Sequence, residues 1–206
     1  MPVQLSGPAD ILFQGDSITA AGRDPGDEYD LGHGYVRLIA DALAVSHPAS
    51  RVRNRGIGGD RAADLLRRWA PDTLALRPAV LSVLVGVNDT WRRYDSGETT
   101  PPEAYEDTYR ELLAQAVSQG TRLVLVEPFL VPVRPEQWAW REDLDARIHA
   151  VRRLANEYGA SLLAADGLLH QAARESGDPS VITEDGVHPT AAGHAVLARA
   201  WLRLVR

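Results

Sequence analysis

The segment that most constrains the fold is residues 79–85, an apolar run rich in Val and Leu. Such a run is typical of a strand that is buried on both faces, as in a parallel sheet covered by helices. Shorter apolar segments predict further strands, and segments with apolar residues at helical spacing lie between them. This alternation predicts an α/β fold, a parallel sheet with helices on both faces. We expect strands at residues 10–14, 51–54, 79–85, 122–127 and 160–164, and helices at 35–46, 60–76, 101–119, 137–158 and 190–204.

Two of these helix starts rest on capping residues. Asp60 follows a glycine-dense turn, and its carboxylate can accept from the free N–H groups of a first helical turn. Thr100-Pro101-Pro102-Glu103 has the pattern of a Thr cap followed by Pro at the first helical position. Residues 86–100 are expected to form a loop. We find no repeat or interdomain linker, so residues 1–206 are expected to form one domain.

Composition excludes several classes of function. The net charge of -6 and the absence of a Lys/Arg run argue against a nucleic-acid partner. The chain has no cysteine, which excludes disulfides, cysteine nucleophiles and thiolate metal sites. Residues 1–10 show no basic stretch followed by an apolar run, so we expect no signal peptide and a cytoplasmic protein. No apolar run approaches the length of a membrane span.

Polar or glycine-rich turns follow three of the expected strands. They are Gly15-Asp16-Ser17, Gly58-Gly59 and Gly86-Val87-Asn88. Ligands of open parallel sheets bind beyond the carboxyl ends of the strands, so these turns are expected to meet at one rim. Ser17 is the candidate nucleophile, and a serine hydroxyl needs a base to remove its proton.

His188 is the best candidate for that base. Asp185 lies three residues earlier in the same turn, where its carboxylate could orient the imidazole and fix its tautomer. Taken alone, an Asp-x-x-His sequence is more often a polar turn. His33, in the first glycine-rich loop, stays open as an alternative. The remaining candidates, His47, His149 and His194, are expected to be surface or packing residues.

An oxyanion hole requires donors that face a developing negative charge. The backbone N–H of Ser17 is one candidate. Gly59 can supply a second N–H, because glycine allows the backbone to approach a substrate closely. The side-chain amide of Asn88 can supply a third. Each position also has a plainer interpretation as a tight turn or a loop cap, but three such turns on one rim favour a site.

Four blocks of sequence, in order, resemble the SGNH hydrolases, also called GDSL-type esterases. The blocks are Gly15-Asp16-Ser17-Ile18-Thr19, Asn54-x-Gly-x-Gly-Gly59-Asp60, Gly86-Val87-Asn88-Asp89 and Asp185-x-x-His188. The resemblance implies a three-layer α/β/α fold with a flavodoxin-like five-stranded parallel sheet. It also implies ester hydrolysis without a metal or organic cofactor. The implied nucleophile is Ser17, with base His188, orienter Asp185 and oxyanion donors Ser17, Gly59 and Asn88.

Residues 88–94, Asn-Asp-x-Trp-Arg-Arg-Tyr, are similar to a subgroup that includes xylan and other carbohydrate acetylesterases. In that subgroup a tryptophan near the catalytic rim helps to shape a small acyl pocket, which implies this role for Trp91. We also place Asp16 among the substrate contacts. Trp138 and Trp140 could stack on sugar rings, although packing under loops or at a subunit contact is the simpler interpretation. Trp69 and Trp201 lie on expected helical faces and are assigned to the core.

The leading hypothesis is a serine esterase for short acyl groups that deacetylates a carbohydrate. The expected partner is a small-molecule or carbohydrate ester, and the chain could form a homo-oligomer. A lysophospholipase or thioesterase with the same machinery is an alternative that would need a longer apolar groove. A non-catalytic carbohydrate-binding protein is a third hypothesis, against which the intact triad argues.

Overall fold

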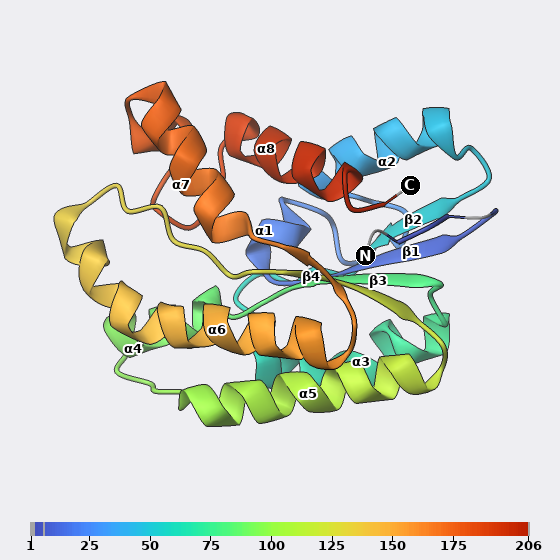
Figure 1. Cartoon of the computed structure of the whole chain (residues 1–206), viewed down its shortest axis with the longest axis horizontal. Helices are drawn as coiled ribbons and strands as arrows, with labels where there is room; N and C mark the ends of the chain where they lie inside the picture. Colours follow the sequence, from blue (N-terminus) through green and yellow to red (C-terminus); the bar gives the residue numbers. More distant parts are fainter. Residues whose placement is uncertain (1–2, 6, 206) are drawn as a thin grey trace.

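A five-stranded parallel sheet between two layers of helices forms the protein (Figure 1). The computed structural model describes residues 3–5 and 7–205. The strand order is β2-β1-β3-β4-β5, the flavodoxin-like order, which confirms the expected fold class. The strands are β1 (Asp10–Gly15), β2 (Arg51–Asn54), β3 (Val80–Leu84), β4 (Arg122–Val126) and β5 (Ser161–Leu163).

The helices divide between the two faces of the sheet. Helices α2, α7 and α8 cover one face, and α3, α5 and α6 cover the other (Figure 1). Within the described residues, none of these helices is long and apolar enough to cross a membrane. The bounds are α1 (Ser17–Ala20), α2 (Tyr35–Ser46), α3 (Ala62–Asp72), α4 (Val87–Asp95), α5 (Pro102–Ser118), α6 (Arg141–Glu157), α7 (Ala165–Ser176) and α8 (Ala191–Leu202), with 3-10 turns η1 (Leu74–Leu76), η2 (Pro135–Trp140) and η3 (Pro179–Val181).

Strand β3 is buried on both faces, as its sequence predicts. Leu81 and Val83 pack into the core under α3 and α5, whereas Val80 and Leu84 pack into the core under α2 and α8. The polar residue in the middle of the strand, Ser82, is also buried, and its hydroxyl accepts a hydrogen bond from Trp201 Nε1 at 3.0 Å. Trp201 and Trp69 both lie in the core, as expected.

Strands β1 and β3 are neighbours at the centre of the sheet, where the strand order reverses. Ligands of flavodoxin-like folds bind at this reversal, beyond the carboxyl ends of the strands. A Cβ atom at Gly15 would collide with the carbonyl group of Leu84, so glycine is required where the two strands end side by side. Strand β1 continues into α1 and β3 continues into α4, and these two short helices carry the candidate site.

Residues 87–95 form helix α4, which corrects the loop expected between Gly86 and Thr100. The sequence of this stretch is strongly polar, which is why it predicts a loop rather than a helix. Asp60 does not cap α3 either, because the N-cap is Arg61. The N–H of Ala62, in the first turn of α3, donates instead to Asp89 Oδ2 at 3.2 Å. The acceptor thus comes from another part of the chain, which local capping rules cannot predict.

Other boundaries also differ from those expected. The helix expected over residues 60–76 ends at Asp72 and is followed by η1. Helix α5 begins one residue later, with Pro101 rather than Thr100 at the N-cap. The long helix expected over residues 137–158 is interrupted, since η2 precedes α6. Gln137 stabilises this separate turn, because its side-chain Oε1 accepts from the backbone N–H groups of Val133 and Arg134.

Candidate active site

Ser17 is the first residue of α1, directly after β1. Asp16 caps this helix, since its Oδ1 accepts from the N–H of Ile18 at 3.0 Å. The neighbouring Asp16 and Ile18 are buried, whereas Ser17 is partly exposed. A tight turn at the end of a central strand therefore presents one hydroxyl at the rim of the sheet, on a rigid support.

Ser17, His188 and Asp185 form a continuous hydrogen-bonded series. Ser17 Oγ lies 2.9 Å from His188 Nε2, and His188 Nδ1 lies 2.7 Å from Asp185 Oδ2. The other oxygen of Asp185 accepts from the backbone N–H groups of Val187 and His188, at 2.9 and 2.8 Å. The turn that carries Asp185 and His188 is closed by a bridge between Thr183 and Pro189. The structure thus brings Ser17 next to His188, which follows it by 171 positions in the sequence.

The electrostatics of this series favour one arrangement of protons. Burial would raise the pKa of Asp185, but hydrogen bonds from the His188 ring and from two backbone N–H groups lower it to about 2. The carboxylate is therefore charged at neutral pH and accepts from Nδ1–H. That tautomer leaves the lone pair of Nε2 facing the Ser17 hydroxyl. The same hydrogen bond to Asp185 raises the pKa of His188 above its ordinary value, against an opposing effect of burial.

The three candidate oxyanion donors are the backbone N–H groups of Ser17 and Gly59 and the side-chain amide of Asn88. No described residue accepts from the backbone N–H of Ser17 or of Gly59. Gly59 adopts φ +84°, which favours glycine. Asn88 Nδ2 donates to the carbonyl oxygen of Asp60 at 3.0 Å. An amide nitrogen carries two hydrogens, so one N–H of Asn88 is left for a ligand, beside the Gly59 turn.

Buried polar contacts support the start of helix α4, which carries Asn88. Arg147 has no exposed side-chain surface, and its Nη2 donates to the carbonyl oxygen of Asp89 at 3.2 Å. Arg147 also pairs with Asp143 at 2.6 Å, which balances the buried charge. Together with the Ala62–Asp89 hydrogen bond, these contacts join α3, α4 and α6 under the candidate oxyanion donors.

Trp91 lies on α4, one helical turn after Asn88, and faces the histidine. The centroids of the Trp91 and His188 rings are 5.8 Å apart, and Trp91 also packs against Trp140 at 5.6 Å. Trp140 is 8% exposed and stacks on Tyr94, which agrees with packing rather than with a free sugar-binding face. The aromatic pair therefore closes one side of the rim next to Asn88.

Asp16 is fully buried, which does not fit its expected place among the substrate contacts. Burial raises the pKa of Asp16 to about 7. Its Oδ2 atom has no hydrogen-bond partner within residues 3–5 and 7–205. The position beside Ser17 suggested a substrate contact, but the capping bond to Ile18 turns the side chain inward. We therefore assign Asp16 to the support of the turn.

A cleft of about 590 Å³ opens beside Ser17 and His188 and extends towards the loop before α2. His33, Glu184 and His194 also line it. His33, the alternative left open, thus shares this cleft with Ser17, but no carboxylate among the described residues bonds to its ring. His194 stacks on Tyr35, which agrees with the expected packing role, and it also lines the cleft. Its Nδ1 accepts from the backbone N–H of Tyr35 at 3.1 Å, so its Nε2 carries the proton. The two remaining alternatives, His47 and His149, do not line this cleft.

Gln137 is a supporting residue that the sequence did not reveal. Its Nε2 donates to the carbonyl oxygen of Asp185 at 2.6 Å, which ties η2 to the turn of the candidate triad. A Cβ atom at Gly186 would lie 2.6 Å from Gln137 Nε2, and Gly186 has φ +96°. The only signal in the sequence is the glycine, which marks a turn but does not identify the residue that packs against it.

Comparisons with known proteins agree on one family. Residues 13–196 match the GDSL-like lipase/acylhydrolase family. The chain is 34% identical to the acetylxylan esterase of Geobacillus stearothermophilus over 203 residues, 94% of this chain and 92% of that enzyme.

Solved structures also resemble the chain over nearly its whole length. The crystal structure of Axe2, an acetylxylan esterase from Geobacillus stearothermophilus, superposes with a TM-score of 0.89 at 32% identity, covering 100% of this chain and 99% of that one. LAE5, an alpha/beta hydrolase enzyme from the metagenome of Lake Arreo, gives a TM-score of 0.88 at 31% identity over 97% and 96% of the two chains. Three catalytic mutants of Axe2 replace an aspartate, a histidine and a serine by alanine.

Proposed function

Because the chain belongs to the GDSL-like lipase/acylhydrolase family and is a carboxylic ester hydrolase, we propose that it removes acetyl groups from a carbohydrate by a serine mechanism. The observation that carries this proposal is the series Ser17–His188–Asp185, with separations of 2.9 and 2.7 Å. The similarity to an acetylxylan esterase supports the choice of acetyl groups and of a carbohydrate.

The proposed reaction starts with His188 Nε2, which accepts the Ser17 proton as Oγ attacks the ester carbonyl carbon. The carbonyl oxygen becomes an oxyanion that the N–H groups of Ser17 and Gly59 and the amide of Asn88 stabilise. The tetrahedral intermediate then collapses, and His188 gives its proton to the departing alcohol. Water, deprotonated by His188, attacks the acyl-enzyme and releases the acid and the free Ser17 hydroxyl.

The surroundings of the triad favour a short acyl group and a polar alcohol. An acyl chain whose carbonyl oxygen faces Asn88 would meet Trp91 one helical turn further on, which leaves little room for a long chain. The open cleft on the other side presents His33, Glu184 and His194, which suit an alcohol with several hydroxyl groups. A lysophospholipase or thioesterase would need an unbroken apolar groove at this point, whereas the apolar residues that line this cleft lie among polar and charged ones.

A series of 4-nitrophenyl esters of increasing acyl length tests this proposal. We expect the highest kcat/KM with acetate and a fall of at least about tenfold by hexanoate, the order of discrimination that pocket shape provides. Trp91→Ala is expected to weaken this preference, while Leu38→Ala, an exposed apolar position on α2, serves as the control. Release of acetate from acetylated xylo-oligosaccharides completes the test. A maximum with octanoate, or no acetate released from any acetylated sugar, would contradict the proposal.

Replacing Asn88 with alanine is expected to lower turnover by roughly 10²- to 10³-fold, the usual loss for one oxyanion donor. KM is expected to change little, because the amide bonds most strongly to the charged oxygen of the transition state. Asn88→Asp should lose more, since a carboxylate offers no donor and repels the oxyanion. Steady-state kinetics measure the effect, with Asn156→Ala on α6 as the control.

Asn88 also donates to the Asp60 carbonyl, so the experiment must separate a role in the oxyanion hole from a purely structural role. That role would lower the melting temperature of Asn88→Ala and leave turnover of the folded variant within a few fold of the wild type. Near-normal turnover in folded Asn88→Asp would remove Asn88 from the oxyanion hole.

A further inference from the structure

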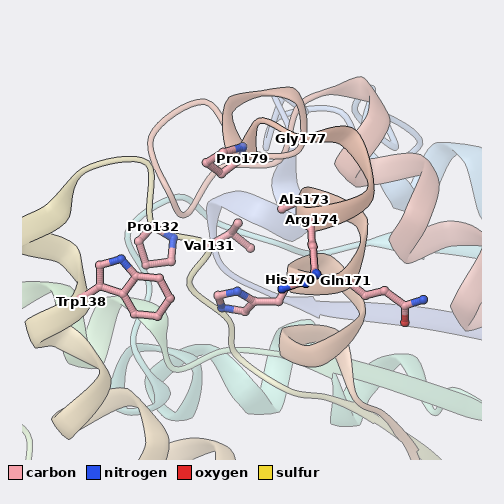
Figure 2. Close-up of a pocket in the computed structure, with 9 residues that line it drawn as sticks. All are labelled: Val131, Pro132, Trp138, His170, Gln171, Ala173, Arg174, Gly177 and Pro179. Atoms are coloured by element: carbon pink, nitrogen blue, oxygen red, sulfur yellow. The ribbon is translucent and has the colours of Figure 1, made fainter.

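A second hollow, of about 700 Å³, lies apart from the Ser17 cleft. It opens between α7 and the chain segment that connects β4 to η2 (Figure 2). This volume is within the range of small-molecule sites. Val131, Pro132 and Trp138 line one side, and His170 and Arg174 from α7 line the other. We refer to this hollow, defined by these five residues, as the Trp138 groove.

Trp138 is the most exposed tryptophan of the structure, at 59%. A single exposed apolar side chain is common on protein surfaces. This indole, however, forms one wall of a hollow, with its ring centroid 6.0 Å from that of His170 (Figure 2). It is also held in place, because the preceding residue, Gln137, bonds to the carbonyl of Asp185 and to two backbone N–H groups. An aromatic face carried by an anchored segment of backbone therefore lines the groove.

The opposite wall offers both an acceptor and donors. His170 Nε2 lies 2.9 Å from the carbonyl oxygen of Leu130 and must donate to it, so in the neutral ring Nδ1 is an acceptor. The guanidinium of Arg174 makes no hydrogen bond or ion pair with the side chain or backbone of another described residue, which leaves its donors free for a ligand. Figure 2 shows Gln171 directed away from the groove, and we assign it no role.

This combination fits the chemistry of a pyranose ring. The C–H face of such a ring is apolar and flat enough to lie on an indole. The hydroxyl groups around the edge of the ring both donate and accept hydrogen bonds. The apolar surface of Val131 and Pro132 forms the base of the groove beside the indole. Arg174 is the one formally charged side chain among the described residues that line the groove, so an uncharged sugar suits these walls better than a phosphate.

The groove is connected to the turn of the candidate triad. The N–H of Val131 donates to the carbonyl oxygen of Gly186 at 2.8 Å, and Thr183 Oγ1 donates to the carbonyl oxygen of Val131 at 3.2 Å. Gly186 lies between Asp185 and His188, so one wall of the groove is bonded to the residues beside the reacting centre. Each hollow also includes a residue that follows the carboxyl end of a strand, Ser17 after β1 and Val131 after β4.

We propose that the Trp138 groove is a sugar subsite in which the indole of Trp138 stacks on a pyranose ring of an acetylated oligosaccharide while another ring of the same chain is deacetylated at Ser17. His170 and Arg174 bind hydroxyl groups of the stacked ring. This inference rests on the proposed function, since it takes the carbohydrate ester as the substrate.

The kinetic test compares a substrate that is too small to reach the groove with one that is long enough. For Trp138→Ala we expect unchanged kcat/KM on 4-nitrophenyl acetate and a loss of roughly 5- to 10-fold on long acetylated xylo-oligosaccharides, as for a stacking contact of about 1 kcal/mol. Trp138→Phe should retain most of the activity on the long substrate, and Val45→Ala, an exposed apolar position on α2, is the control. An equal loss on both substrates, or no loss on either, would overturn the proposal.

A binding test keeps the proposal testable even if no acetylated sugar is hydrolysed. Calorimetry with the Ser17→Ala variant measures binding of acetylated xylo-oligosaccharides without turnover, and adding Trp138→Ala should weaken it roughly 5- to 10-fold. Equal binding by the two variants would overturn the subsite. So would a change of oligomeric state on Trp138→Ala with sugar binding intact, because the groove would then be a contact between copies of the chain. Hydrolysis of 4-nitrophenyl acetate, measured in parallel, tests the proposed esterase activity independently of the subsite.

Discussion

Replacing Ser17 with alanine is expected to lower turnover of 4-nitrophenyl acetate by about 10⁴- to 10⁶-fold, the loss typical of a catalytic serine. The reason is that Oγ, 2.9 Å from His188 Nε2, is the atom that would form the bond to the acyl carbon. The side chain is small and partly exposed at the rim, so thermal unfolding should change little. Activity measured with purified protein, alongside a thermal melt, checks both expectations.

Ser118→Ala is a matched control for this substitution. Ser118 ends α5 and is exposed, and among the described residues its hydroxyl bonds only to the carbonyl oxygen of Gln115. It should keep wild-type activity. A folded Ser17→Ala variant that retains a tenth of the wild-type turnover would exclude Ser17 as the nucleophile.

Asp185→Asn should lower turnover by about 10⁴-fold, the loss expected when the base is held in the wrong tautomer. An asparagine amide can donate to Nδ1, which would place the ring proton on Nε2, facing Ser17. The base would then have no lone pair for the serine proton. Asp178→Asn, an exposed aspartate near the end of α7, is the control and should behave as the wild type.

Asp185→Asn is also expected to shift the pH profile of kcat/KM. His188 must be neutral to act as a base, so kcat/KM should rise with pH through the pKa of its ring. Asp185 raises that pKa because its carboxylate stabilises the charged imidazolium. Removal of the carboxylate charge should therefore move the rise to lower pH. A residual activity in Asp185→Asn that rises at the same or a higher pH than in the wild type would show that Asp185 does not act on His188.

The fold could be predicted because its signals are local. The apolar run of β3 and the alternation of strands with helices are properties of short segments, and Ser82 does not disturb the run because Trp201 satisfies its hydroxyl. The α4 helix was missed because residues 87–95 are polar. Its start is fixed by contacts of Asp89 with Ala62 and Arg147, which come from distant parts of the chain.

The site was predictable to the extent that each residue follows a strand or a recognisable turn. Ser17, Asn88 and the Asp185–His188 pair meet that condition, and the structure brings them to one rim. Asp16 meets it too, but its side chain turns inward to cap α1. His194 and Gln137 lie within helical segments, and only the folded arrangement places them beside the cleft and under the Asp185 turn. A single sequence carries no local signal for such contacts.

Labelling with a serine-directed fluorophosphonate, followed by mass spectrometry, tests the central claim most directly. The reagent reacts with a serine that a neighbouring base activates. We predict one label per chain, located on Ser17, with loss of esterase activity in proportion to labelling. His188→Ala should slow the labelling strongly, and Ser17→Ala should abolish it. An enzyme that hydrolyses 4-nitrophenyl acetate yet carries its label on another residue, or takes up none at all, would contradict the account.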